Sequence, residues 1–182
     1  MAAGPGGLWF VNDGTFSIGR ITTSGKVTDF TSFELNIPVD ITAGPDGAMW
    51  FTDVGNDAIG RITKAGVVTE FRPSGILGGE PGGIAAGTDG ALWFTNGTSI
   101  GRMTTAGAVT YYTDPSISAG GPITAGPDGA LWFINGNNSI GRITTAGKVT
   151  TFTDPGIDGP STITAGPDGA LWFINFGIRD VL

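Results

Sequence analysis

The sequence predicts an all-β protein built from one repeated unit, and three observations lead to this prediction. The five tryptophans stand at positions 9, 50, 93, 132 and 172, so a unit of roughly 40 residues recurs along the whole chain. Each unit contains short runs rich in Ile, Val, Thr, Trp and Phe, which are typical of strands. No segment has a 3.6-residue apolar period long enough for a helix.

Each unit contains four predicted strands, and the fourth unit shows them most plainly. Its strands are expected at residues 123–126, 130–134, 139–144 and 148–152. The intervening segments carry turn residues, among them Pro127-Asp128-Gly129, in which proline presets φ and glycine accepts a positive φ. Four antiparallel strands in every repeat indicate a β-propeller blade. A solenoid is the alternative, but four differently patterned strands per repeat favour blades.

The repeats define a single propeller domain over residues 1–182 with four complete blades and part of a fifth. The blades are expected at about 1–38, 39–81, 82–121 and 122–161, followed by a half-blade at 162–182. Small residues in the first strand of each blade suit the crowded central channel. The Trp-Phe pairs of the second strands suit packing between blades, and Tyr111 and Tyr112 are assigned to the same core, with an aromatic- or glycan-binding platform as the alternative.

Composition and charge exclude several classes of function. The net charge is −7, so nucleic-acid and anionic-membrane partners are not expected. The chain has no Cys, and therefore no disulfide and no thiolate zinc site. It has no His, which removes the commonest general base and metal ligand. No signal peptide is visible and no apolar run approaches the roughly 20 residues that span a bilayer, so we expect a soluble chain of unknown location.

The repeated motifs also resemble a known family. Gly-Pro-Asp-Gly-Ala-Leu-Trp-Phe, Ile-Gly-Arg-Ile-Thr and the following Gly-x-Val-Thr strand are similar, in the same order, to the repeat of the virginiamycin B lyase (streptogramin lyase) family. The resemblance covers essentially the whole chain. It implies a propeller, which has seven blades in that family, and an elimination that linearises a streptogramin depsipeptide with a His base and Mg²⁺. The present sequence departs from this pattern in having no His and fewer blades.

An open arc of blades has a predictable consequence for assembly. Each Trp or Phe in a blade interface buries about 150–250 Å², so an uncovered blade face would be a large apolar patch. Two chains would close a ring of eight or nine blades, with the half-blade of one beside the first blade of the other. The alternative is one chain closed as a strained five-bladed ring. We expect the homodimer.

Candidate ligand-binding residues lie in the loops that share one face of a propeller. They are Asp53, Asp57, Glu80, Asn96 and Asn137. Glu80 stands in the longest loop, where desolvation would let it act as a base; an ordinary surface acid is the alternative. Together with other loop acids and amides, these side chains would offer oxygen ligands to Mg²⁺ or Ca²⁺, whereas the alternative is that Asn and Asp simply form turns.

Two further sets of charged residues recur, and the first of them, the turn acids, is expected on the opposite face. The turn acids Asp46, Asp89, Asp128 and Asp168 are assigned a structural role, with Gly6 in place of Asp in the first copy. The repeated arginines Arg20, Arg61, Arg102 and Arg142 are expected to pair with these acids or with backbone carbonyls between blades. A ring-shaped anion site is the alternative for the arginines.

Three functional hypotheses follow. The first is a non-enzymatic, lyase-like propeller fragment or building block that self-associates to close a ring, needs no cofactor and has an unknown ligand. The second is a streptogramin B lyase-like C–O eliminase that uses a carboxylate base and a divalent cation. The third is a module that binds a small ligand or glycan at the channel mouth. The missing His favours the first, and no catalytic residue is assigned.

Overall fold

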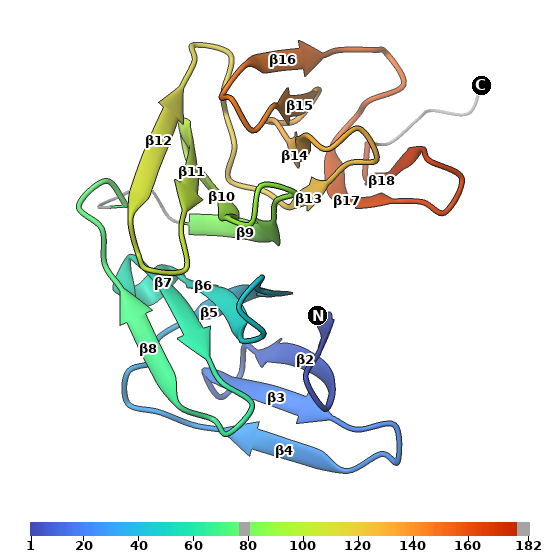
Figure 1. Cartoon of the computed structure of the whole chain (residues 1–182). Helices are drawn as coiled ribbons and strands as arrows, with labels where there is room; N and C mark the ends of the chain where they lie inside the picture. Colours follow the sequence, from blue (N-terminus) through green and yellow to red (C-terminus); the bar gives the residue numbers. More distant parts are fainter. Residues whose placement is uncertain (77–80, 178–182) are drawn as a thin grey trace.

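The structure, a computed structural model, describes residues 1–76 and 81–177 as five antiparallel sheets that follow one another around an open arc (Figure 1). The first blade contains β1 (Ala2–Gly4), β2 (Gly7–Asn12), β3 (Ser17–Ile21) and β4 (Val27–Phe30). The second contains β5 (Pro38–Ala43), β6 (Met49–Asp53), β7 (Ala58–Ile62) and β8 (Val68–Phe71), with the short 3-10 helix η1 (Val54–Asn56) between β6 and β7. The third contains β9 (Pro81–Ala86), β10 (Leu92–Asn96), β11 (Ser99–Met103) and β12 (Val109–Thr113). The fourth contains β13 (Ile123–Ala125), β14 (Leu131–Ile134), β15 (Ile140–Ile143) and β16 (Val149–Phe152), and β17 (Pro160–Ala165) pairs with β18 (Leu171–Asn175). These sheets confirm the predicted all-β propeller fold.

The second strand of each blade divides its side chains between the two neighbouring blades. Trp9 packs in one cluster with Met49 and Phe51 of the next blade, so tryptophan faces forward along the chain and phenylalanine faces backward. The same alternation places Trp50 against Phe94 and Trp93 against Phe133. Since successive side chains of a strand point to opposite faces, the Leu/Met-Trp-Phe sequence supplies both interfaces of a blade. This confirms the tryptophans as interblade core in the first three blades.

A glycine of the third strand lets each backward-facing phenylalanine lie flat on its own sheet. Gly60 is paired directly opposite Phe51, and a Cβ added at Gly60 would overlap the Phe51 ring. Gly101 and Phe94 repeat the arrangement in the third blade. The glycine in the Ile-Gly-Arg motif is therefore required for ring packing, not for an unusual backbone angle.

Threonine side chains join neighbouring blades near the channel. The Thr52 hydroxyl donates to the carbonyl of Gly82 at 2.7 Å, and the Thr95 hydroxyl donates to the carbonyl of Gly121 at 2.8 Å. Asp40 adds a further connection, because its Oδ2 accepts the backbone N–H of Ile84 at 2.9 Å. These bonds pair polar groups that the blade interfaces would otherwise leave without partners.

The turn acids and the arginines form one repeated unit inside the second, third and fourth blades. In the second blade, Asp46 Oδ1 accepts the Trp50 indole N–H at 2.9 Å and Oδ2 accepts Arg61 Nε at 2.7 Å. Both parts of the prediction for the arginines are therefore confirmed: three of them pair with the turn acid of their own blade, and Arg20 of the first blade donates to a backbone carbonyl of the next blade. The equivalent pairs are Arg102–Asp89 at 2.6 Å and Arg142–Asp128 at 2.7 Å.

The first blade lacks this acid because its turn is one residue shorter. Gly4 pairs with Gly7, which leaves only Pro5 and Gly6 in the turn, with Gly6 at φ 86°. The prediction that Gly6 directly replaces Asp is thus wrong in register. Arg20 instead lies over the rings of Trp9 and Phe30 and donates from Nη1 to the carbonyl of Lys64 in the second blade at 3.0 Å.

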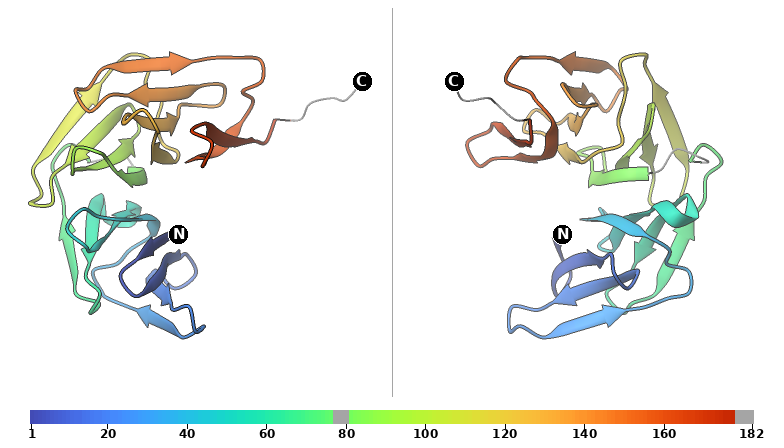
Figure 2. Two further views of the ribbon diagram at one scale, coloured as in Figure 1. Left: turned by 45° about the vertical axis from the view of Figure 1, so that its right-hand side comes forward. Right: turned by 180° about the vertical axis from the view of Figure 1, so that it is seen from behind.

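The two ends of the arc leave blade faces uncovered, as both views in Figure 2 show. Trp172 of β18 is 60% exposed, whereas Trp9, Trp50 and Trp93 are fully buried. At the other end, Leu8 of β2 is 44% exposed, whereas its counterparts in the other complete blades are fully buried. Those counterparts are Met49, Leu92 and Leu131. None of the described residues forms a helix long and apolar enough to cross a membrane.

Candidate functional site

The loops that follow the second strands meet the loops that enter each blade from the one before. In four of the five sheets an asparagine ends the second strand or directly follows it, at Asn12, Asn96, Asn135 and Asn175, whereas the second blade has Asp53 there. Asn135 shows how the amide works. Its Oδ1 accepts the Ser118 N–H at 2.7 Å, and its Nδ2 donates to the carbonyl of Ser116 at 2.9 Å and to Ser139 Oγ at 3.1 Å. The asparagine therefore fastens the incoming loop to its own blade.

In the second blade this fastening is divided between two side chains. Asp53 Oδ2 accepts the backbone N–H of Asn36 at 2.8 Å, as the amide oxygen does in the fourth blade. A carboxylate has no N–H to donate to the backbone carbonyl of the incoming loop. Asn56 supplies this donor instead: its Nδ2 donates to the carbonyl of Glu34 at 2.6 Å. The serine found beside the asparagine in the other complete blades is Ala58 here. Asp53 Oδ1 corresponds to the asparagine Nδ2 of the other blades. Because it carries no N–H, it can donate neither to the loop carbonyl nor to a serine hydroxyl.

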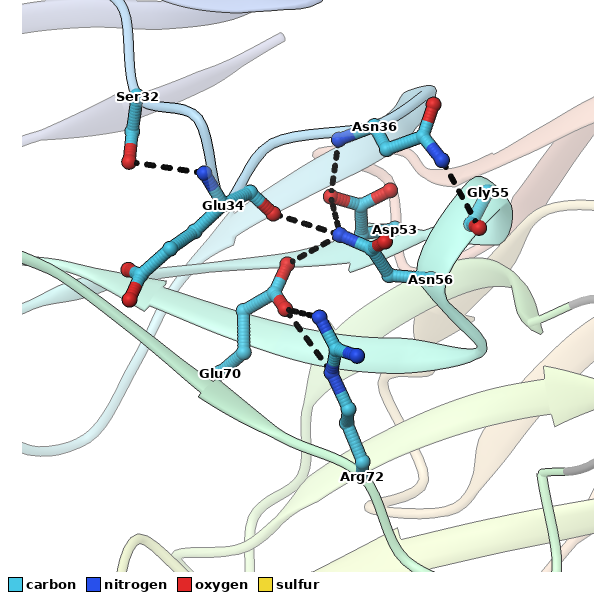
Figure 3. Close-up of polar contacts among 8 residues, drawn as sticks. All are labelled: Ser32, Glu34, Asn36, Asp53, Gly55, Asn56, Glu70 and Arg72. Atoms are coloured by element: carbon cyan, nitrogen blue, oxygen red, sulfur yellow. Dashed lines mark hydrogen bonds and ion pairs between the residues drawn. The ribbon is translucent and has the colours of Figure 1, made fainter.

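Glu70 and Arg72 complete this cluster, which Figure 3 shows with the loop residues around it. Asn56 Nδ2 also donates to Glu70 Oε1 at 3.0 Å, and Arg72 places Nε and Nη2 at 3.2 and 2.7 Å from Glu70 Oε2. The Glu70 side chain is almost completely buried, whereas Arg72 is mostly exposed. We call Asp53, Asn56, Glu70 and Arg72 the Asp53 cluster.

The electrostatics of the cluster favour a neutral Asp53. Burial is the largest cause and raises the pKa of Asp53 to about 7; the Asn36 N–H opposes this rise, and the neighbouring Glu70 carboxyl adds to it. Asp53 is fully buried, and its Oδ1 has no hydrogen-bond partner among the described residues. The cluster is therefore a pair of acids of which one resists ionisation near neutral pH.

The structure distributes the five predicted ligand-binding residues over several blades. Asp53 lies in the cluster, and Asp57 follows η1 with a positive φ of 49°. Asn96 is buried, and its Nδ2 donates to the carbonyl of Gly75 and to Ser99 Oγ. Asn137 is exposed on the fourth blade. Glu80 lies outside the described residues. The assignment of these residues to ligand binding stays a prediction.

The sequence analysis did not single out Glu70 and Arg72. A signal for them was present, since Asp53 and Ala58 are the departures from the Asn and Ser that the other complete repeats carry at these positions. The partner of such a departure cannot be read from spacing alone, because Glu70 comes from the fourth strand of the blade. Its register, Glu70 opposite Gly60, is what places it beside the cluster.

The channel side of the arc offers a cavity and no acidic cage. A cavity of about 510 Å³ is lined by the first strands of all five sheets, including Ala2, Ile41, Gly83, Thr124 and Thr164. In the part of the chain that the structure describes, no three acidic side chains come together in a way that could hold a metal ion. The Mg²⁺ that the resemblance implies therefore has no cage among these residues and stays a prediction.

The repeat and the order of the blades define the chain as a β-propeller protein. The model of the virginiamycin B lyase family matches residues 1–181, and the chain belongs to this family. Selenomethionine-substituted virginiamycin B lyase from Staphylococcus aureus is 40% identical, with a TM-score of 0.85 over 93% of this chain and 59% of that protein. A streptogramin B lyase structure is 34% identical, with a TM-score of 0.85 over 96% of this chain and 60% of that one.

More distant structures share the fold alone. A putative gluconolactonase is 18% identical, with a TM-score of 0.69 over 91% of this chain and 66% of that one. No curated protein matches the chain. The chain spans about three fifths of the length of the two lyases that it resembles.

Proposed function

We propose that this chain is a lyase-like propeller arc that works as an assembly unit without catalysis, and that a second copy closes its two open blade faces. The observation that carries the proposal is the exposure of Trp172, at 60%, where the tryptophans of the first three blades are fully buried. An uncovered face of this kind is an apolar patch that a soluble protein normally covers.

The two open faces are complementary in the way that the internal interfaces are. The forward face of the half-blade presents Trp172 and Ile174, and the backward face of the first blade presents Leu8 and Val27. Inside the arc, the forward face of one blade always packs on the backward face of the next, as Trp9 does on Met49 and Phe51. We therefore choose the backward face of another copy as the partner, because the same pair of faces already packs together inside the arc.

A second copy also satisfies both faces at once. If the forward face of one chain packs on the backward face of its partner, a two-fold axis creates the same contact at the other end. Each contact would bury aromatic and aliphatic side chains with no new chemistry. Further blades from a longer polypeptide would cover the same faces, and this alternative is an outcome of the test below.

The test uses two variants that each disable one face. Trp172→Glu removes the forward face and Leu8→Glu removes the backward face; both positions are exposed within one chain, so the blades should still fold. Each variant alone should be monomeric by light scattering on a sizing column. An equimolar mixture should recover a dimer, because one intact contact remains. Phe33→Asp is the matched control, since Phe33 is 99% exposed in the loop between β4 and β5 and should leave the mass unchanged.

Three outcomes would overturn the proposal. A monomeric chain with its natural sequence would mean that the faces stay open or need other blades. A dimer that survives both glutamate variants would place the contact elsewhere. A glutamate variant that stays dimeric on its own, while the other is monomeric, would indicate a contact between like faces rather than head-to-tail closure.

Catalysis of the family type is the second candidate, favoured by the 40% identity to virginiamycin B lyase. One solved structure of that enzyme is a catalytically inactive histidine-to-alanine variant with quinupristin. The present chain has no histidine, so such a base would have to come from outside these 182 residues. The test is linearisation of virginiamycin B with Mg²⁺ and with a chelator. Metal-dependent opening above background would establish a lyase, and no opening would leave the assembly function.

A further inference from the structure

We propose that Asp53 and Glu70 share one proton, and that this buried acid–carboxylate pair holds the loop between β4 and β5 on the second blade. The proposal concerns a single blade and does not depend on the oligomeric state. The attachment of this loop to the second blade would then depend on pH, whereas the other blades use an uncharged asparagine at the equivalent position.

The unpartnered oxygen is the first argument. Asp53 is fully buried, its Oδ2 is used by the Asn36 N–H, and its Oδ1 meets no donor among the described residues. A buried carboxylate oxygen without a donor is costly, and a proton on that oxygen removes the cost. The Glu70 carboxyl lies beside Asp53, because one nitrogen, Asn56 Nδ2, is 3.4 Å from Asp53 Oδ2 and 3.0 Å from Glu70 Oε1, and Glu70 is the acceptor that we assign to this proton. A protonated Asp53 Oδ1–H would then donate to an ionised Glu70.

The first blade supplies the second argument, because it carries the same geometry with an amide. Asn12 occupies the position of Asp53, and its Nδ2 donates to Asp29 Oδ1 at 3.1 Å. Asp29 stands opposite Gly19 as Glu70 stands opposite Gly60, so Asp29 and Glu70 are equivalent. The contact is amide to acid in the first blade and acid to acid in the second. Asn56 Nδ2 of η1 gives Glu70 one donor, and a proton on Asp53 would restore the donor that Asn12 provides from the end of the second strand in the first blade.

The charged groups around the pair agree with this assignment. Arg72 directs two N–H groups at Glu70 Oε2, and for this reason we assign the proton to Asp53 and the negative charge to Glu70. Glu34 belongs to the loop being held, and its negative charge also acts on Arg72. Burial and Glu70 together raise the pKa of Asp53 to about 7, which places the proton on Asp53 below neutral pH.

The held loop contains a backbone position that needs such support. Ile37 has φ 66°, a left-handed conformation that is strained for a β-branched residue. The backbone N–H of the neighbouring Asn36 donates to Asp53. The carbonyl of Ile37 itself accepts the Val54 N–H at 3.1 Å. If Asp53 ionised beside an ionised Glu70, two negative charges would lie together where the loop is hydrogen-bonded to the second blade.

The test compares unfolding of the natural chain and Asp53→Asn between pH 5 and pH 8. The native pKa of Asp53 is raised above its unfolded value of about 3.9, so the native state keeps a proton that the unfolded state has lost. The resulting stability is present at low pH and is lost as pH rises toward 7. Relative to Asp53→Asn, the unfolding equilibrium constant of the natural chain should rise at least about tenfold over this range.

Reciprocal variants in the first blade provide the matched control. Asn12→Asp should import a smaller pH dependence of the same sign, because it creates an acid pair with Asp29 in a less buried place. Asp29→Asn should differ from the natural chain by the same amount at pH 5 and pH 8. In the natural chain, a carbon NMR signal of a carboxyl group that disappears in Asp53→Asn should titrate near neutral pH.

Two results would overturn the assignment. A difference between the natural chain and Asp53→Asn that is constant from pH 5 to pH 8, with the Asp53 carboxyl titrating near pH 4, would show that no proton is shared. An increase in the unfolding midpoint at pH 8 on adding Ca²⁺ or Mg²⁺, absent from Asp53→Asn, would assign the pair to a cation instead.

Discussion

The second and third blades and the half-blade β17–β18 are built from the same motifs but differ in what covers them. Trp50 and Trp93 stack on Phe71 and Tyr112 of their own fourth strands and are covered by the next blade. Trp172 belongs to a sheet in which two strands are described, and it faces outward. One motif is therefore core in one place and surface in another, which teaches that the repeat determines the blade and the neighbours determine burial.

The largest effect that would sharpen this comparison is removal of an internal tryptophan. Trp93→Ala should destabilise the chain by about 3–5 kcal/mol, because a fully buried ring leaves a cavity between two blades. Trp172→Ala should cost far less in one chain and should instead abolish the concentration dependence of the unfolding midpoint. Denaturant unfolding at two protein concentrations measures both. Equal losses for the two variants would contradict the comparison.

Substitution of the glycines under the phenylalanine rings should also destabilise a covered blade more than an open one, but by a smaller amount. Gly60→Ala should cost about 1–3 kcal/mol, because the new Cβ overlaps the buried Phe51 ring. Gly19→Ala should cost less, since the Phe10 ring above it lies on the open face and has room to move. Thermal unfolding of both variants is the measurement. Gly14→Ala is the control, because a Cβ there meets nothing within 4 Å.

The smallest expected effect concerns the arginine pairs. Partial burial raises the pKa of Asp89, but hydrogen bonds from Arg102 and Trp93 outweigh it, so the pKa lies below the usual value. The pair's contribution is present above pH 4 and is lost as pH falls through the native pKa. Asp89→Asn should therefore cost only about 0.2–1 kcal/mol at pH 7, with less difference at acid pH and in high salt. A loss that persists unchanged at pH 2.5 would rule out the ion pair as its cause.

Much of the fold was predictable from the sequence because the repeat carries its own local rules. The turn at Asp128, the glycine of Ile-Gly-Arg and the alternation around Trp132 each act within one blade, so spacing reveals them. The Asp53 cluster was predictable only in part. Asp53 was singled out, but Glu70 reaches it through strand pairing and Asn36 through an incoming loop, and neither contact has a fixed spacing. The short turn at Gly6 was misread because a deletion and a substitution look alike within a single repeat.

The measurement that tests the central claim most directly is the solution mass of the natural chain by light scattering at several concentrations. Closure by a second copy predicts one stable species at twice the chain mass of 18.5 kDa, with no larger species as concentration rises. A monomer of 18.5 kDa at every concentration would contradict the account, because the exposed faces at Leu8 and Trp172 would then need no partner of their own kind.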